Sequence, residues 1–166
     1  MLKEISIAQV QLNPFTAIGK EWMLITAGDE KGCNMMTASW GGMGVLWRKN
    51  VAMMVIRPQR HTLSFVDNQD YYALCFFDEK YREALNFCGK YSGRDYDKAK
   101  ETGLTTVFDA EAPYFAEAKL VIICKKLYKH QFDPACFIDN SIDANCYPDK
   151  DYHECFVGEI VKVLAE

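Results

Sequence analysis

The 166-residue sequence contains no apolar run that approaches the roughly 20 residues of a membrane-spanning helix. Residues 1–10 alternate polar and apolar side chains without a basic flank and an apolar block, so no export signal is expected. Acidic residues (23) outnumber basic ones (19), giving a net charge of −4. This balance lacks the broad basic surface that a nucleic-acid backbone requires. We therefore expect neither a membrane nor a nucleic-acid partner.

Common nucleotide, redox and zinc motifs are missing as well. Without a G-x-x-x-x-G-K-[ST] or G-x-G-x-x-G loop, a nucleotide would have to bind by other means. No two of the seven cysteines have a C-x-x-C spacing, which argues against a thioredoxin-type pair or a zinc knuckle. Their odd number favours free thiols in a reducing compartment, hence a cytoplasmic protein. One alternative is a zinc or iron site built from Cys136, Cys146, His153 and Cys155, although this spacing matches no recognised metal motif.

Short apolar runs separated by turn signals predict a protein made mainly of β-strands. Runs at 22–27 and 33–40 flank the glycine-bounded segment 28–32 and predict a hairpin. Gly41, Gly42 and Gly44 are expected to break the second of these strands. Further strands are predicted at 51–56, 71–77, 118–128 and 155–164, the last with a bulge at Gly158.

Helical segments are few and fall between strands without βαβ regularity. They are predicted at 61–68, from an Asp78 N-cap to a stop at Gly89, at 94–102, and in a turn opened by Asp133 and Pro134. The sequence has no internal repeat or linker. We expect a single domain over residues 1–166, a closed or split antiparallel β-barrel with peripheral helices.

Polar side chains within the 34–42 segment form the first candidate binding element. Asn34, Thr37 and Ser39 interrupt an apolar strand, and two glycines follow them. A half-exposed strand would explain this alternation. The functional alternative is contact with a polar, planar ligand, which the glycines would allow to approach the backbone closely. Aromatic residues make up 13% of the chain and could either fill the core or stack on such a ligand.

Basic residues form the second and third candidate elements. Arg57, Arg60 and Thr62 follow a buried strand at the start of a predicted helix, a place suited to a phosphate, although a charged surface loop would look the same. Arg94 and Lys98 lie in a polar segment that is either a solvated helix start or a lid over an anionic ligand.

Taken together and in this order, four stretches resemble the flavin reductase-like proteins, the group with an FMN-binding split barrel that includes flavoredoxin. The stretches are 34–40, 57–62, 87–98 and 151–153, the last followed by Gly158. The resemblance runs from residue 22 to residue 160. It implies a split, Greek-key antiparallel barrel with a few helices, and a homodimer that binds FMN near its interface. The chain departs from the family pattern at 48–51, where many relatives have Ser-x-x-Pro-Pro, and at Lys150, which replaces the Gly of Gly-Asp-His.

The resemblance also implies roles for individual residues. The 34–40 strand would lie along the isoalloxazine and ribityl chain, 57–62 would hold the phosphate, and His153 would help to place the hydride donor. His153 is therefore the candidate catalytic residue. The candidate cofactor-binding residues are Asn34, Met35, Met36, Thr37, Ala38, Ser39, Trp40, Arg57, Pro58, Arg60, His61, Thr62, Ser92, Arg94 and Lys98.

The activity implied is that of an FMN-dependent oxidoreductase. NADH or NADPH would deliver hydride to flavin N5, and the flavin would pass electrons to an acceptor. The cofactor carries this chemistry, which agrees with the lack of a recognisable catalytic dyad. The alternative is an FMN-containing electron-transfer protein, flavoredoxin-like, that is reduced by a protein partner instead of a nicotinamide.

Overall fold

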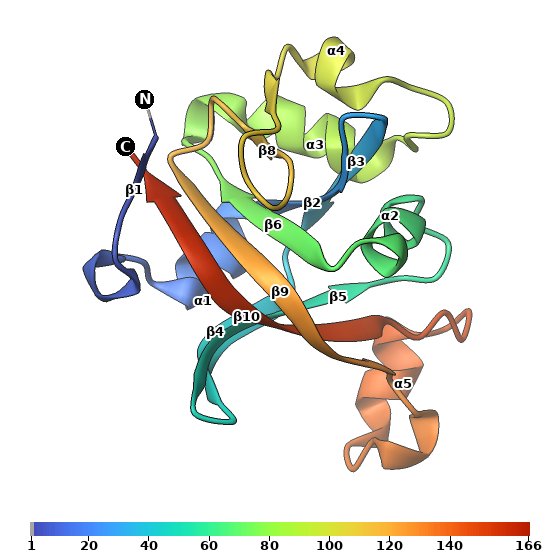
Figure 1. The fold of residues 1–166 in the computed structure, drawn as a ribbon. Helices are drawn as coiled ribbons and strands as arrows, with labels where there is room; N and C mark the ends of the chain where they lie inside the picture. The colour runs from blue at the N-terminus through green and yellow to red at the C-terminus, as the bar shows by residue number, and fades with distance from the viewer. Residues whose placement is uncertain (1) are drawn as a thin grey trace.

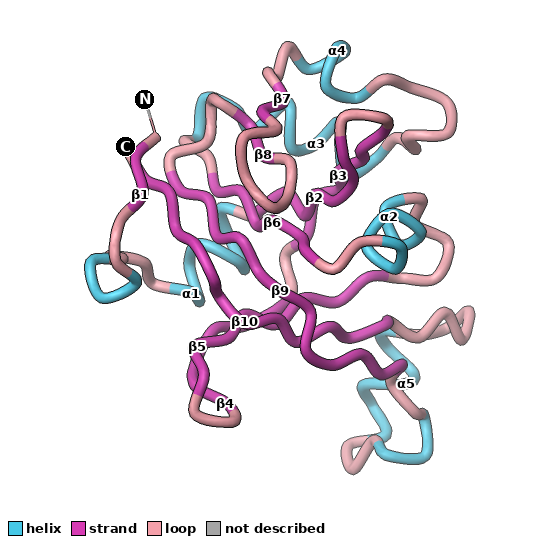
Figure 2. Tube along the Cα trace, in the orientation of Figure 1, coloured by secondary structure: helices cyan, strands magenta, loops and turns pink. Residues whose placement is uncertain are grey.

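The computed structural model describes residues 2–166, and an eight-stranded antiparallel sheet forms its frame (Figure 1, Figure 2). The strands follow the order β3 (Gly32–Ala38), β2 (Met23–Asp29), β6 (Tyr71–Phe76), β9 (Leu120–Gln131), β10 (Glu154–Ala165), β5 (Lys49–Ile56) and β4 (Gly41–Leu46), with β1 (Lys3–Glu4) paired to β10. The two ends of this order, β3 and β4, are consecutive in the chain and joined only by Ser39 and Trp40. The sheet is a split barrel, so the predicted fold class is confirmed.

The predicted hairpin and the later strands are also confirmed. β2 and β3 pair from Met23 opposite Ala38 to Asp29 opposite Gly32, so the turn is shorter than the predicted 28–32 segment. β9 extends past its predicted end to Gln131. The register between β9 and β10 shifts at Gly158, which is the expected bulge.

The second strand of the hairpin ends at Ala38, before the glycines, as predicted, but the glycines themselves belong to a further strand that was not predicted. Gly41, Gly42 and Gly44 lie in β4, which pairs with β5 from Gly41 opposite Met54 to Leu46 opposite Lys49. A neighbouring strand supplies the backbone hydrogen bonds whatever the side chains are, so tertiary pairing outweighs the low strand propensity of glycine. Trp47 and Arg48 turn the hairpin with φ values of 52° and 60°, the left-handed pair typical of a two-residue connection.

The helices and remaining short elements lie around the sheet. They are η1 (Ile7–Gln9), α1 (Pro14–Thr16), η2 (Ala17–Glu21), α2 (Thr62–Asn68), η3 (Glu79–Tyr81), α3 (Arg82–Lys90), α4 (Lys98–Thr102), η4 (Pro134–Cys136), α5 (Asn140–Cys146), and the small β7 (Thr106–Val107) and β8 (Tyr114–Phe115) pair. Among the described residues, no helix has the length and apolar character needed to cross a membrane.

Three helix predictions need correction. α3 continues through Gly89 to Lys90, because a glycine there lets the helix approach Thr37 of β3, whose Cβ would lie 3.3 Å from an added Cβ. The helix predicted at 94–102 begins only after Asp97, whose side chain accepts from the Lys100 amide. α5 was not predicted, and it places a helix beside the junction of β9 and β10 (Figure 1).

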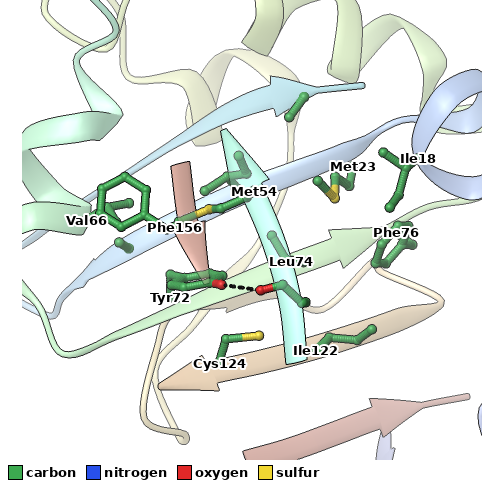
Figure 3. Close-up of a cluster of buried hydrophobic side chains, with 14 of the residues drawn as sticks. Ile18, Met23, Met54, Val66, Tyr72, Leu74, Phe76, Ile122, Cys124 and Phe156 are labelled. Carbon is green, nitrogen blue, oxygen red and sulfur yellow. Dashed lines mark hydrogen bonds between the residues drawn. The ribbon is translucent and has the colours of Figure 1, made fainter. Parts of the chain in front are cut away.

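Apolar side chains fill the barrel interior, as Figure 3 shows for Met23, Met54, Phe76 and their neighbours. Tyr72 is fully buried there, and its hydroxyl donates to the Ala52 carbonyl oxygen at 3.0 Å. A second apolar cluster packs β6 and β9 against α3 and β8. The two clusters fix both faces of these strands and hold β3 beside α3.

Candidate functional site

Two cavities lie next to β3, and Arg60 belongs to the wall of both. The larger encloses about 240 Å³ and is lined by Met36, Thr37, Ala38, Ser39, Trp40, Val55, Arg57, Arg60 and His153. The smaller encloses about 100 Å³ and is lined by Asn34, Gln59, Arg60, His61, Thr62, Gly89, Lys90, Tyr91, Ser92, Gly93 and Lys98. Their shared wall makes them two compartments of one candidate site.

The smaller cavity is polar and basic, and no carboxylate lies in its wall. Arg60 donates to the carbonyl oxygens of Gly89 and Cys88 at 3.0 Å and 3.3 Å. Lys98 is 3% exposed and donates to the Cys88 oxygen at 3.0 Å. Backbone carbonyls at the end of α3 therefore hold the half-buried Arg60 and the buried Lys98 in place. Such a donor set suits an anion with several acceptor oxygens.

Burial shapes the charges of this cavity. Desolvation lowers the pKa of Lys98 to about 8, with a smaller lowering contribution from the nearby Arg60 guanidinium and an opposing one from Cys88. Burial also lowers the pKa of His61, with smaller contributions from Arg94 and Lys98. The cavity is thus a place where positive charges repel one another, and a bound anion would relieve that repulsion.

A glycine-containing loop forms part of the wall of the smaller cavity. A Cβ on Gly93 would collide with Asn34 Oδ1, so the loop can cross β3 this closely only with glycine there. Asn34 Nδ2 donates to Thr62 Oγ1 at 2.9 Å, and both side chains are buried. Arg94 Nη1 donates to the Gln59 carbonyl oxygen at 3.3 Å, tying the loop to the 57–62 segment. Of the two cations in the predicted lid segment, Lys98 lies in the cavity wall, whereas Arg94 is held by a backbone carbonyl outside it.

The larger cavity has aromatic and basic groups opposite the end of β3. The rings of Trp40 and His153 lie 5.1 Å apart between centroids. His153 Nδ1 is 2.8 Å from the Tyr147 hydroxyl oxygen. Burial lowers the pKa of His153 to about 4, helped by Arg57 and opposed by Asp151. The imidazole is therefore neutral at physiological pH.

Arg57 lies in the larger cavity and is absent from the wall of the smaller one. It forms an ion pair with Asp151, donates to the Cys146 carbonyl oxygen at 3.0 Å, and stacks over the Tyr147 ring at 5.2 Å. Only Pro58 and Gln59 separate it from Arg60, yet Arg60 lines both cavities and Arg57 lines the larger one alone. The geometry thus separates Arg57 from the other residues expected at the phosphate.

Most residues expected from the sequence do meet at these cavities, with three exceptions. Met35 points to the opposite face of β3 from Met36 and is buried in the second core cluster. Pro58 and Arg94 line neither cavity. Gln59 and Tyr91 lie inside the stretches 57–62 and 87–98 but were not singled out as site residues. Tyr147 was missed because no motif marks it.

The alternative metal site is not assembled. Across residues 2–166, no three His, Cys, Asp or Glu side chains are grouped as metal ligands, and Cys136 is exposed while His153 is buried. All seven cysteines are free thiols.

A family model described as a flavin reductase like domain matches residues 15–166. The chain belongs to the flavin reductase-like family. The two cavities therefore lie in a flavin reductase-like domain, on the strand and loop segments through which the sequence resembles the family. A search of curated proteins found no match.

Solved structures of this family share the fold. An FMN-binding domain of a flavin reductases-like enzyme from Shewanella baltica superimposes with a TM-score of 0.70 at 14% identity, covering 99% of this chain and 77% of that one. Flavoredoxin of Desulfovibrio vulgaris (Miyazaki F) gives a TM-score of 0.67 at 21% identity, with coverages of 99% and 77%. An NADH:FAD oxidoreductase from Streptomyces globisporus, in complex with NAD and FAD fragments, gives 0.63 at 15% identity, with coverages of 86% and 73%.

Proposed function

We propose that the protein is an FMN-binding oxidoreductase whose smaller cavity takes the FMN phosphate and whose larger cavity takes the flavin ring. The observation that carries this proposal is the carboxylate-free wall containing Arg60 and Lys98, joined through Arg60 to a cavity beside β3. The donor set fits a phosphate, and the loop that carries Gly93 passes close to Asn34 in the cavity wall.

The chain's own residues would position the cofactor and exclude water. Arg60, Lys98, Thr62 and Ser92 would bind the phosphate, and the backbone from Met36, near the end of β3, to Ser39 would face the ring edge. When bound, FMN supplies the hydride-accepting and electron-passing chemistry. No side chain then needs to act as a nucleophile.

NADH or NADPH is the electron donor in this proposal. Support comes from the Streptomyces globisporus neighbour, which is an NADH:FAD oxidoreductase captured with an NAD fragment. His153 and Trp40 line the larger cavity, whereas Lys98 lines the smaller one, so a second ligand would meet the flavin beside His153 and Trp40. His153, neutral and buried, would orient that ligand with a hydrogen bond instead of a charge.

Electron transfer with a protein partner is the second candidate function. The likeness to a flavoredoxin favours it, and so do the departures from the family pattern at 48–51 and Lys150. In this case FMN would occupy the same two cavities, and a nicotinamide would fail to reduce it.

We further propose a homodimer in a reducing, cytoplasmic setting. Val45, Trp47, Met53 and Tyr128 expose large apolar side chains on β4, β5, β9 and the hairpin turn, with Trp47 and Tyr128 in ring contact at 6.1 Å. Apolar groups clustered in this way are typical of an interface.

The seven free thiols support a reducing compartment.

The visible absorbance spectrum of the purified protein tests the function directly. Flavin bands that bleach on anaerobic addition of NADH or NADPH would support the reductase and identify the donor. Bands that persist with both nucleotides would favour the electron-transfer protein. A colourless protein that does not take up added FMN would refute both flavin proposals.

A further inference from the structure

Tyr147 is a buried residue in direct contact with His153, and no sequence motif marks it. It follows α5 directly, and its backbone amide donates to the Asp143 carbonyl oxygen at 3.0 Å. Only 2% of the residue is exposed. The Arg57 guanidinium covers its ring, and Asp151 in turn holds Arg57. The phenol is therefore fixed in position before any ligand arrives.

The contact between the Tyr147 hydroxyl and His153 Nδ1 decides which imidazole nitrogen carries the proton. Burial raises the pKa of Tyr147, so its hydroxyl keeps its proton at neutral pH. Across residues 2–166, His153 Nδ1 is the only side-chain acceptor recorded for that proton, at 2.8 Å. A buried hydroxyl that donated to nothing would lose the free energy of a hydrogen bond. The hydroxyl therefore donates to Nδ1, and the neutral ring carries its proton on Nε2.

His153 Nε2 is available to a ligand. Nε2 has no hydrogen-bond partner among the described residues. Among those residues, the only fully buried side-chain nitrogen or oxygen without a partner is Thr26 Oγ1, so Nε2 is not fully buried. Nε2 is therefore accessible, and His153 forms part of the wall of the larger cavity, with Trp40 against its ring.

We propose that Tyr147 is a positioning residue that locks His153 as the Nε2–H tautomer, so that the larger cavity presents a hydrogen-bond donor to the ligand that meets the flavin. A donor at this point selects a carbonyl or carboxamide oxygen over a group that must itself donate. The chemical class fits the carboxamide of a nicotinamide. The identity of that ligand rests on the proposed function, whereas the assignment of the tautomer is independent of it.

Nitrogen-15 NMR of histidine-labelled protein tests the tautomer without FMN or a nicotinamide. The protein has three histidines, and the His153 signals are identified by their loss in His153→Gln. At neutral pH we expect His153 to give the pattern of a single Nε2–H tautomer. In Tyr147→Phe, which removes the hydroxyl alone, we expect that pattern to give way to a mixture. A wild-type His153 protonated on Nδ1 would overturn the proposal, even if Tyr147→Phe did not fold.

Kinetics with FMN-loaded protein test the consequence for ligand binding. In Tyr147→Phe the KM for the nicotinamide should rise about three- to tenfold, the effect of one neutral hydrogen bond, while kcat and FMN affinity stay unchanged. Tyr152→Phe is the matched control, because that hydroxyl bonds to Asp143 at 2.7 Å and its ring lies 5.0 Å from Tyr147. Equal effects from both variants would assign Tyr147 a merely structural role. A wild type with the expected tautomer but no nicotinamide turnover would refute the proposed donor and leave the tautomer assignment intact.

Discussion

Arg60 and Lys98 donate to one and the same acceptor, the backbone carbonyl of Cys88, at 3.3 Å and 3.0 Å. One arginine from the 57–62 turn and one lysine from α4 are thereby held at the end of α3, 38 residues apart in the chain. Neither has a carboxylate partner in the cavity wall. Neutral carbonyl oxygens hold the two cations in place without neutralising their charge, so both remain able to pair with an incoming anion.

Replacement of Arg60 by alanine tests the phosphate role of the smaller cavity. Arg60→Ala should weaken FMN binding by about 1.5–3 kcal/mol, the range for a hydrogen bond to a charged group. Titration of flavin fluorescence measures the change, and Lys100→Ala, an exposed cation on the same helix as Lys98, is the control. Equal affinity in Arg60→Ala and the wild type would remove Arg60 from the site.

The pH dependence of FMN affinity tests the role of Lys98. Its pKa is lowered to about 8 in the free protein, whereas a bound phosphate dianion would favour the charged ammonium and raise that pKa. Binding above pH 8 therefore takes up a proton, so affinity should be level from pH 6.5 to 7.5 and fall as the pH rises past about 8. Calorimetric titrations at several pH values measure this slope. The slope should vanish in Lys98→Met, and its persistence there would contradict the assignment.

His153 is predicted to act on the rate of flavin reduction and not on cofactor affinity. His153→Ala should slow reduction by NADH or NADPH while FMN stays bound, as stopped-flow absorbance would show. Because the pKa of His153 is lowered to about 4, the wild-type rate should show no histidine titration between pH 5.5 and 7.5. An unaltered rate in the alanine variant would make His153 a structural residue.

Local sequence patterns predicted most of the barrel strands but not every element and residue around the candidate site. Alternating or continuous apolar runs identified β2, β3, β6, β9 and β10, because each of them buries the face that the pattern marks. β4 was missed, since its glycines carry no such pattern and its hydrogen bonds come from β5.

The absence of Arg57 from the smaller cavity could not be foreseen for a similar reason. Asp151, the ion-pair partner of Arg57, is 94 residues away in the chain, and only the pairing of β5 with β10 brings the two together. Tyr147 likewise reaches His153 through the fold of the 132–153 connection, which no motif in the sequence describes.

The exposed apolar face at the β4–β5 hairpin predicts self-association. Val45 is 73% exposed and Trp47 54% exposed, so a charged side chain is tolerated there in a monomer but not inside an interface. Val45→Glu should convert a dimer to a monomer in sedimentation velocity. Phe108→Glu, on a different exposed apolar residue near β7, should leave the assembly unchanged. A wild-type monomer at all accessible concentrations would refute the dimer.

Gly158 at the β10 bulge is predicted to be required for barrel packing. An added Cβ would lie 2.5 Å from the Tyr72 hydroxyl oxygen and 2.7 Å from Cys124 Cβ. Both groups are fully buried, and the bond to the Ala52 carbonyl holds the Tyr72 hydroxyl in place, so neither can move aside easily. Gly158→Ala should therefore lower the free energy of unfolding by about 1–3 kcal/mol, as expected for overpacking.

Urea denaturation measures this loss, and Gly44→Ala is the matched control because nothing lies within 4 Å of its added Cβ. Tyr72→Phe separates the two contacts, since it removes the nearest atom and leaves Cys124 in place. If the clash with the hydroxyl dominates, the double variant Gly158→Ala, Tyr72→Phe should lose less free energy of unfolding than the two single variants lose together. Strict additivity would assign the cost to Cys124 instead, and a Gly158→Ala protein as stable as Gly44→Ala would show that the bulge relaxes without strain.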